Sequence, residues 1–178
     1  MKETQTHWEG LRTASGTAEE IPAALTALRS FDKKVRQAAY WKIDNHAVLQ
    51  GDLYEAAPFV VRAVLDSLKV TSVANEEFYD LLIEFANGYA PETRVASVDG
   101  SEEPLLAATV RELAKGMALY WRDLRGPRSG IRKQVADLLL ALSERVELDA
   151  GKLRSALDTE ADEEVAGVLA ELLRDVDP

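Results

Sequence analysis

Three carboxylates in one predicted helix are spaced so that they can act together on a charged partner. Glu76, Asp80 and Glu84 follow one another at intervals of four residues within 75–88, and Glu77 lies beside them. In a helix this spacing places the three side chains on one face, opposite the apolar side chains of the same segment. Such a row can attract a cationic group, but it contains no group that would make or break a bond.

The stretch that follows, 89–104, lacks helical periodicity and adds four more acids, Glu92, Asp99, Glu102 and Glu103. An irregular connection of this length in a compact helical domain is usually functional or disordered. Two interpretations of these eight acids stay open. They are a solvated helix face with an acidic loop, or they form a docking surface for a basic partner. We predict the docking surface.

The acids near the C-terminus have the composition of a calcium site but not its pattern. Asp158, Glu160 and Asp162 resemble the start of an EF-hand loop. The sixth position, however, is Glu163 where glycine is required, and the twelfth is Leu169 where a bidentate glutamate is required. These acids are expected to lie at the start of a helix, where its dipole favours negative charge.

The chain lacks the residue patterns of the common enzyme classes. It has no cysteine, and His7 and His46 do not belong to an HExxH motif. A nucleophile elbow, a phosphate-binding P-loop and a GxGxxG motif are also missing from the sequence. We therefore predict a protein that is not an enzyme, with no catalytic residues, no metal and no cofactor.

Two Tyr–Trp pairs, each followed by a cation, occur 80 residues apart, as Tyr40-Trp41 and Tyr120-Trp121. Exposed rings could anchor a protein partner or stack on bases. Buried rings would instead fill the space between packed helices. Both interpretations stay open, and the four rings are secondary candidates for partner binding.

Helical periodicity runs through almost the whole chain, so helices must position these groups. Apolar residues recur at helical spacing in eight segments, and no segment shows the convincing alternation of a strand. Asp32 and Asn75 are predicted N-caps, and Pro58 either begins or kinks its helix. The predicted fold is all-α, with about eight or nine helices in a single domain, 1–178. The segments are 19–30, 32–46, one ending at about 69, 75–88, 104–124, 131–145, 149–157 and 161–175.

The net charge of −10 is unevenly distributed over the 178 residues. Residues 64–110 carry nine acids against two basic side chains, 147–178 carry ten against three, and 111–134 carry seven basic side chains against two acids. An acidic chain repels a phosphate backbone, which argues against a nucleic-acid partner. No apolar run approaches the roughly 20 residues of a membrane span, and residues 1–10 lack a signal-peptide pattern. We predict a cytoplasmic protein with no membrane partner.

Two stretches, DKKVRQAAYW from residue 32 and SGIRKQVADLLLAL from residue 129, share a polar start, a Val/Ile-Arg pair, and then Ala and Leu. They resemble the HEAT repeat, and the resemblance covers most of the chain. HAVLQGDLYEAAPFVVRAVL, at 46–65, is similar to the His-Gln-Gly-x-x-Tyr-Glu-Ala signature of a narrower bacterial group, although three residues separate His46 from Gln50 here. The resemblance implies a HEAT-like α-solenoid of stacked antiparallel helix pairs.

Proteins of this bacterial group are often encoded beside secreted polymorphic toxins, which implies an immunity role. The hypothesis is an immunity protein that neutralises a cognate, basic toxin domain by occlusion and charge complementarity. One alternative is a HEAT-like DNA glycosylase of the alkylation-repair type. Another is an assembly scaffold in which the basic segment 111–134 contacts an acidic block of another copy. The basic residues available to either are Arg111, Lys115, Arg122, Arg125, Arg128, Arg132 and Lys133.

Overall fold

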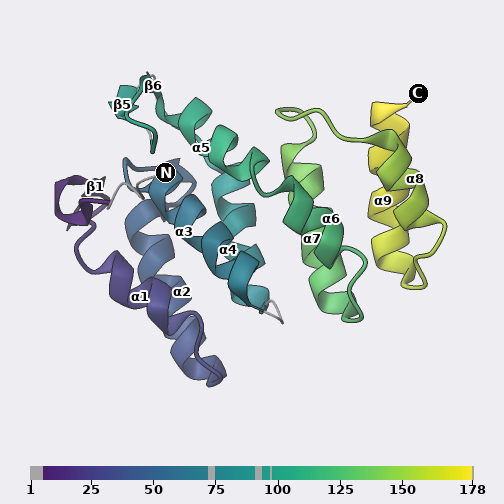
Figure 1. Cartoon of the computed structure of the whole chain (residues 1–178), viewed down its shortest axis with the longest axis horizontal. Helices are drawn as coiled ribbons and strands as arrows, with labels where there is room; N and C mark the ends of the chain where they lie inside the picture. Colours follow the sequence, from purple (N-terminus) through teal and green to yellow (C-terminus); the bar gives the residue numbers. More distant parts are fainter. Residues whose placement is uncertain (1–5, 72–74, 91–93, 97, 178) are drawn as a thin grey trace.

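The computed structural model describes residues 6–71, 75–90, 94–96 and 98–177 (Figure 1). Most of these residues are helical, which confirms the all-α class. The helices in the described part are α1 (Ile21–Ala27), α2 (Lys33–Ala47), α3 (Ala57–Val70), α4 (Glu76–Asn87), α5 (Leu105–Ala114), α6 (Met117–Asp123), α7 (Ser129–Leu142), α8 (Ala150–Leu157) and α9 (Glu163–Val176), preceded by a 3₁₀ turn, Trp8–Gly10.

The connections between helices contain short antiparallel hairpins, where the sequence predicted no strand. Each strand has only two or three residues, too few to show an alternating pattern. Gln50 and Gly51 form one hairpin turn, and their positive φ angles, 53° and 86°, suit a two-residue turn between paired strands. The pairs are β1 (Arg12–Thr13) with β2 (Gly16–Thr17), β3 (Val48–Leu49) with β4 (Asp52–Leu53), and β5 (Arg94–Ala96) with β6 (Glu102–Pro104).

The predicted helix caps are confirmed. The Asp32 side chain accepts a 2.8 Å hydrogen bond from the backbone N–H of Lys34 at the start of α2. The Asn75 side chain accepts one of 3.2 Å from Phe78 N–H at the start of α4. Each cap satisfies a backbone donor that lacks a partner within its helix. Pro58 lies in the first turn of α3, so it begins the helix and does not kink it.

The segment predicted as one helix, 104–124, is two helices that meet at Gly116. A Cβ on Gly116 would lie 2.3 Å from the Tyr120 ring and hydroxyl and 2.7 Å from Leu65 Cδ2. The Tyr120 hydroxyl donates a 2.9 Å hydrogen bond to the Leu113 carbonyl, which also accepts one of 2.9 Å from the Gly116 N–H. The buried ring therefore occupies the space that a side chain at 116 would need.

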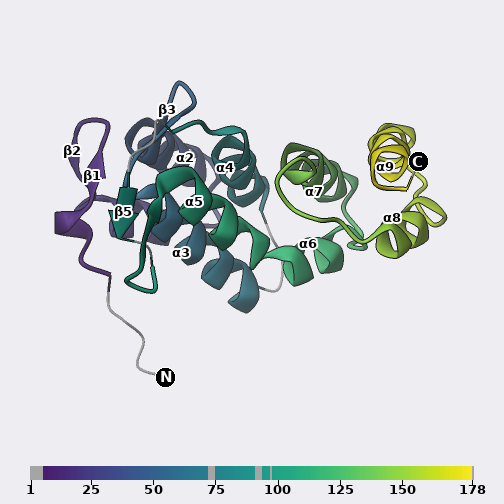
Figure 2. The ribbon, with the colours of Figure 1, turned by 90° about the horizontal axis from the view of Figure 1, so that it is seen from above.

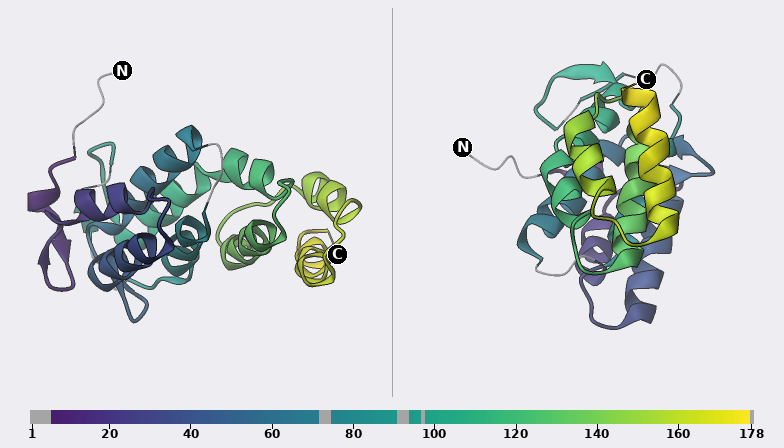
Figure 3. Two further views of the ribbon diagram at one scale, coloured as in Figure 1. Left: turned by 90° about the horizontal axis from the view of Figure 1, so that it is seen from below. Right: turned by 90° about the vertical axis from the view of Figure 1, so that its right-hand side faces the viewer.

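The helices form consecutive pairs, and the second helices of the pairs lie side by side. α1 packs on α2, α3 on α4, α6 on α7 and α8 on α9, while α5 packs on α3 and α4. α2, α4, α7 and α9 contact one another in that order and form one layer (Figure 2). Figure 3 shows the same elongated arrangement, with α8 and α9 at the end far from α1. The outer side of this layer is a continuous surface along the molecule.

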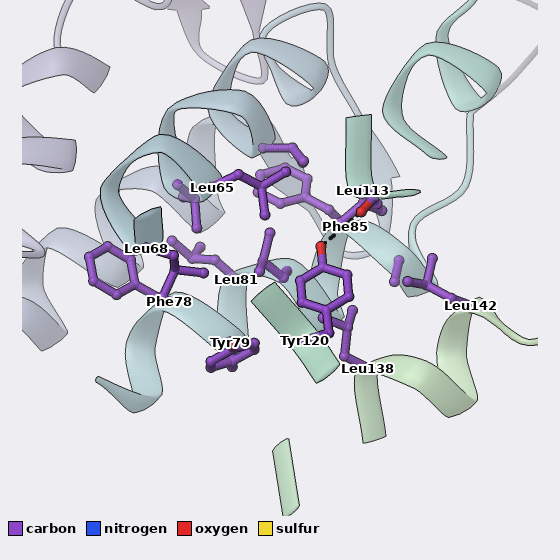
Figure 4. Packing of buried hydrophobic residues seen from close by; sticks show 14 of the residues in the cluster. Leu65, Leu68, Phe78, Tyr79, Leu81, Phe85, Leu113, Tyr120, Leu138 and Leu142 are labelled. Carbon is purple, nitrogen blue, oxygen red and sulfur yellow. Dashed lines mark hydrogen bonds between the residues drawn. The ribbon is translucent and has the colours of Figure 1, made fainter. Parts of the chain in front are cut away.

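The apolar side chains of both layers form one cluster of buried residues, which extends from Ala18 to Leu172. Figure 4 shows its centre, where Phe78 and Phe85 of α4 lie among leucines of α3, α5 and α7. Phe78 and Phe85 are fully buried, as the helical pattern predicted. Burial of this face determines which side of α4 turns outward.

Candidate functional site

The three carboxylates of the row predicted on α4 lie on one side of that helix. Glu76, Asp80 and Glu84 lie on the outer side of α4, because Phe78 and Leu82 on the opposite side are fully buried. Glu76 is exposed, whereas Asp80 and Glu84 are half-buried between neighbouring helices. The row therefore belongs to the surface formed by α2, α4, α7 and α9.

Glu76 lies against the first turn of α7. Its Oε1 is 3.2 Å from the position that a Cβ would take on Gly130, the second residue of α7. The first turn of a helix carries partial positive charge from its unpaired N–H groups. Glu76 is therefore partly compensated within the protein.

Asp44 of α2 and Asp80 of α4 each lie within electrostatic range of Glu84, and these three residues are called the carboxylate cluster below. Asp80 Oδ1 accepts a 2.5 Å hydrogen bond from Gln134 Nε2 of α7. Glu84 lies close enough to Asp44 for the two charges to repel each other. Within the described residues no cation forms an ion pair with any of the three. The cluster thus presents negative charge that the chain itself does not neutralise.

The surroundings of the cluster raise the pKa of two members. Burial is the main cause of the raised pKa of Asp80; the hydrogen bond from Gln134 opposes it, and the charges of the other α4 acids add to it. Burial also raises the pKa of Asp44, and the charge of Glu84 raises it further. A raised carboxyl pKa means that the fold disfavours the ionised form. A cation placed beside the cluster would remove part of this unfavourable energy.

The acidic surface continues onto α7 and α9, which the sequence analysis did not identify. Asp137 of α7 is half-buried, and burial raises its pKa. Beyond it, a groove of about 620 Å³ lies near the C-terminal ends of α4, α7 and α9 and is lined by Glu144, Glu171 and Asp175, together with Arg145. Glu171 and Asp175 belong to α9, whereas Asp137 lies in α7 and Glu144 just after it. They could have been found only by comparing the outward positions of helices in one layer.

Glu77 does not belong to this surface, contrary to the prediction. It is only 5% exposed, and its Oε2 accepts a 2.9 Å hydrogen bond from Arg36 Nε of α2. The helical turn places Glu77 100° from its neighbours in sequence, toward α2. The charge of Glu77 is therefore neutralised within the protein by Arg36.

Some acids of the stretch predicted as an irregular loop, 89–104, form ion pairs within the chain. Asp99 and Glu103 each have a carboxylate oxygen 2.8 Å from a terminal nitrogen of Arg111. Glu102 is exposed in β6, and Glu92 lies outside the described residues. The described part of the loop is folded into the β5–β6 hairpin, and Arg111 neutralises much of its charge. The expectation that these acids extend the row on α4 is therefore not supported.

The two Tyr–Trp pairs have different environments. Tyr120 is fully buried and Trp121 is 8% exposed, so these rings belong to the core. Tyr40 is half-buried, and Trp41 is 58% exposed, with its ring edge-on to Tyr40 at a centroid distance of 5.0 Å. Only the first pair is accessible to a partner, and it adjoins the carboxylate cluster, because the charge of Asp44 acts on Tyr40.

The basic segment 111–134 makes ion pairs within the chain. Arg125 and Arg128 are exposed and pair with no residue that the structure describes. Every other basic side chain of the segment meets a carboxylate: Arg111 meets Asp99 and Glu103, Lys115 meets Glu112, Arg122 meets Asp123, Arg132 meets Glu160 and Lys133 meets Glu164. The positive charge that a nucleic-acid contact would need is therefore mostly neutralised by carboxylates of the same chain.

The signature-like segment and the C-terminal acids have structural roles. Glu55 accepts hydrogen bonds from the backbone N–H and the guanidinium of Arg12, which holds β1 against the start of α3. Asp162 caps α9 by accepting from the backbone of its first turn. Glu160 pairs with Arg132 at 2.8 Å. The predicted position at a helix start is confirmed for Asp162, whereas it is wrong for Asp158, which is the C-cap of α8.

Comparisons with known proteins give no family. No protein-family model matches the chain, and no curated protein matches it. In the described ranges, no three His, Asp or Glu side chains are grouped so that they could hold a metal ion. Among the helices of those ranges, none has both the length and the apolar character needed to cross a bilayer.

Proposed function

We propose that this chain is a non-catalytic, HEAT-like solenoid of stacked helix pairs that binds another protein through the outer surface of α2, α4, α7 and α9. The order in which these helices contact one another supports a stack of pairs. A stack of this kind presents a long, continuous face, which suits recognition of a folded partner.

The carboxylate cluster is the observation that carries the proposal. Asp44, Asp80 and Glu84 come from two helices, are partly withdrawn from water and lack a cation among the described residues. The charge of Glu84 disfavours the ionised forms of Asp44 and Asp80, so this arrangement costs free energy unless a cation is present. A basic side chain from a partner would be attracted to the cluster and would stabilise the ionised carboxylates.

The partner that fits best is a cognate toxin domain with a basic surface, and the protein would be its cytoplasmic immunity protein. The chain carries a net charge of −10, which would accelerate encounter with a basic partner at low ionic strength. Trp41, 58% exposed beside the cluster, could anchor the complex as a buried aromatic contact. Inhibition would follow from steric coverage of the toxin.

The alternative of a DNA glycosylase has less support. Five basic side chains of 111–134 already contact carboxylates of the same chain. Tyr120 and Trp121 are buried and could not stack on a base without local unfolding. Contact with a phosphate backbone requires free, clustered cations.

The direct test is coexpression with the product of the neighbouring gene. If that product is toxic, the parent chain should protect the host and form a complex with it. The variant Asp44→Lys/Asp80→Lys/Glu84→Lys should lose protection and bind at least about 100-fold more weakly, since three charge contacts become repulsions.

The matched control is Glu19→Lys/Glu147→Lys/Asp158→Lys, which changes three exposed carboxylates elsewhere by the same total charge. It should protect as the parent does, apart from a general loss of steering. Equal binding by the cluster variant and the parent would contradict the proposal. Self-association of the purified chain, with no partner, would favour the scaffold.

A further inference from the structure

A cavity of about 420 Å³ opens in the N-terminal half of the molecule, where β1, β4 and the segment after α4 meet. Figure 2 shows β1 and β5 in the N-terminal half, away from α8 and α9. Tyr89 is held beside β4, because its N–H donates to the Gly51 carbonyl at 2.7 Å and its carbonyl accepts from Leu53 N–H at 2.8 Å. The size is within the range of small-ligand sites.

Thr13 is one of the residues that line this cavity, and its hydroxyl is buried. Thr13 is only 7% exposed, and its Oγ1 makes no hydrogen bond to any described residue. Burying a hydroxyl without a partner is unfavourable, and such groups are uncommon in native proteins. Because this Oγ1 is shielded from solvent, Thr13 contributes to the wall of the cavity but not a hydrogen bond to a ligand.

The charges around the cavity favour a positively charged ligand. The Arg12 guanidinium is neutralised by Glu55, to which its Nε donates a 2.8 Å hydrogen bond. Asp52 is exposed at the cavity and pairs with no cation that the structure describes. Tyr54 and Tyr89 also line the cavity, and Tyr89 is 63% exposed. Aromatic faces attract cations, and a nearby carboxylate strengthens the attraction.

We propose that this cavity binds an organic cation, a protonated amine or guanidinium carried on an apolar stem. The cationic group would lie between Asp52 and the tyrosine rings. The stem would contact Leu53 and Leu105, which form the apolar part of the wall. The inference is independent of the proposed function, because none of these residues belongs to the outer surface of α2, α4, α7 and α9.

The test uses three probes of nearly the same shape, pentylamine, pentanol and pentanoate, added to the purified chain. Methyl resonances of Leu53 and Leu105 report on the cavity, and those of Leu169, a buried residue of α9, serve as the distant reference. Pentylamine should shift the cavity resonances in a saturable manner, more tightly than pentanol, while pentanoate should produce no saturable shift. Equal responses to pentylamine and pentanoate would overturn the proposal, as would no saturable response to pentylamine.

Two substitutions test the residues. Asp52→Asn should weaken pentylamine binding about fivefold, the effect expected for one partly exposed charge pair. Thr13→Val keeps the shape of the side chain and, because the hydroxyl is shielded from the cavity, should leave the affinity for pentylamine unchanged. Glu147→Gln, an exposed acid near α8, is the distant control and should also leave this affinity unchanged. An unchanged affinity in Asp52→Asn would contradict the assignment.

The same chemistry could come from a free amine or from a basic side chain of a protein. A comparison of agmatine with the peptide acetyl-Gly-Arg-Gly-amide separates the two sources. Tighter binding of the peptide assigns the cavity to a protein side chain, and tighter binding of agmatine assigns it to a small molecule. Failure of both to bind would argue against the cavity as a cation site, and it would leave the toxin-binding proposal untouched.

Discussion

Arg36 and Glu77 form a buried ion pair, with Arg36 Nε 2.9 Å from Glu77 Oε2. Arg36 Nη1 also donates to the carbonyl of Ser30, six residues earlier. Arg132 repeats the arrangement: its Nη1 donates to the Gly126 carbonyl, six residues earlier, and its Nε lies 2.8 Å from Glu160. Both arginines are the fourth residue of their helix, α2 or α7. An arginine at the fourth position of the helix thus links the preceding turn to a carboxylate of the next helix pair, once in α2 and once in α7.

Glu77→Ala should destabilise the protein strongly. The substitution leaves the Arg36 guanidinium largely buried without its carboxylate, and losing one partner of a buried pair costs about 3 kcal/mol. Urea unfolding at neutral pH measures the change. Asp66→Ala removes the partner of exposed Lys69 and should cost less than about 1 kcal/mol. A loss at Glu77 no larger than at Asp66 would show that the pair does not hold the stack together.

Glu160→Gln should reveal a stabilising charge that depends on pH. The hydrogen bond from Arg132 lowers the pKa of Glu160, with burial opposing. A lowered pKa in the folded state means that this stability is present above the ordinary value of 4.5 and is lost as pH falls through the lowered value. The variant should therefore be less stable than the parent at about pH 7 and nearly equal to it in strong acid. A difference that stays constant across this range would exclude an ionic origin.

Asp44→Asn/Asp80→Asn should have the opposite effect on stability. Burial raises the pKa of both residues, so their contribution is most favourable below the ordinary value of 3.8 and is lost as pH rises through the raised values. Near neutral pH the variant should be more stable than the parent, by up to about 0.5 kcal/mol per site, because solvent screens these half-exposed groups. The gain should vanish in acid. The same variant should bind a basic partner less well, a combination that a merely structural role would not produce.

Gly116→Ala and Gly167→Ala form a matched pair of substitutions. At Gly116 a Cβ would lie 2.3 Å from the Tyr120 ring, so alanine should destabilise by about 2 kcal/mol through overpacking. At Gly167, inside α9, nothing lies within 4 Å of the added Cβ. Alanine there should stabilise by about 0.5–1 kcal/mol through helix propensity. Thermal unfolding of both variants checks the signs, and stabilisation at Gly116 would mean that Tyr120 does not cause the helix break.

Local sequence was sufficient for those features that depend on a single helix. The apolar spacing of α4, the caps Asp32 and Asn75, and the helical class of the chain all follow from contacts within a few residues. The outward row Glu76, Asp80 and Glu84 was predictable for the same reason. The short hairpins were not, because strands of two or three residues are too brief to show an alternating pattern.

Only the tertiary structure determined which carboxylates are paired with a cation and which are not. Glu77 stands next to Glu76 in the chain, yet it pairs with Arg36, which lies 41 residues earlier. Asp44 stands 40 residues from Glu84, yet the two share one cluster. The sequence therefore determined the helices and the amount of negative charge. Helix packing determined where that charge is neutralised and where it stays available, because Coulomb interactions and burial depend on distance in space and not on separation along the chain.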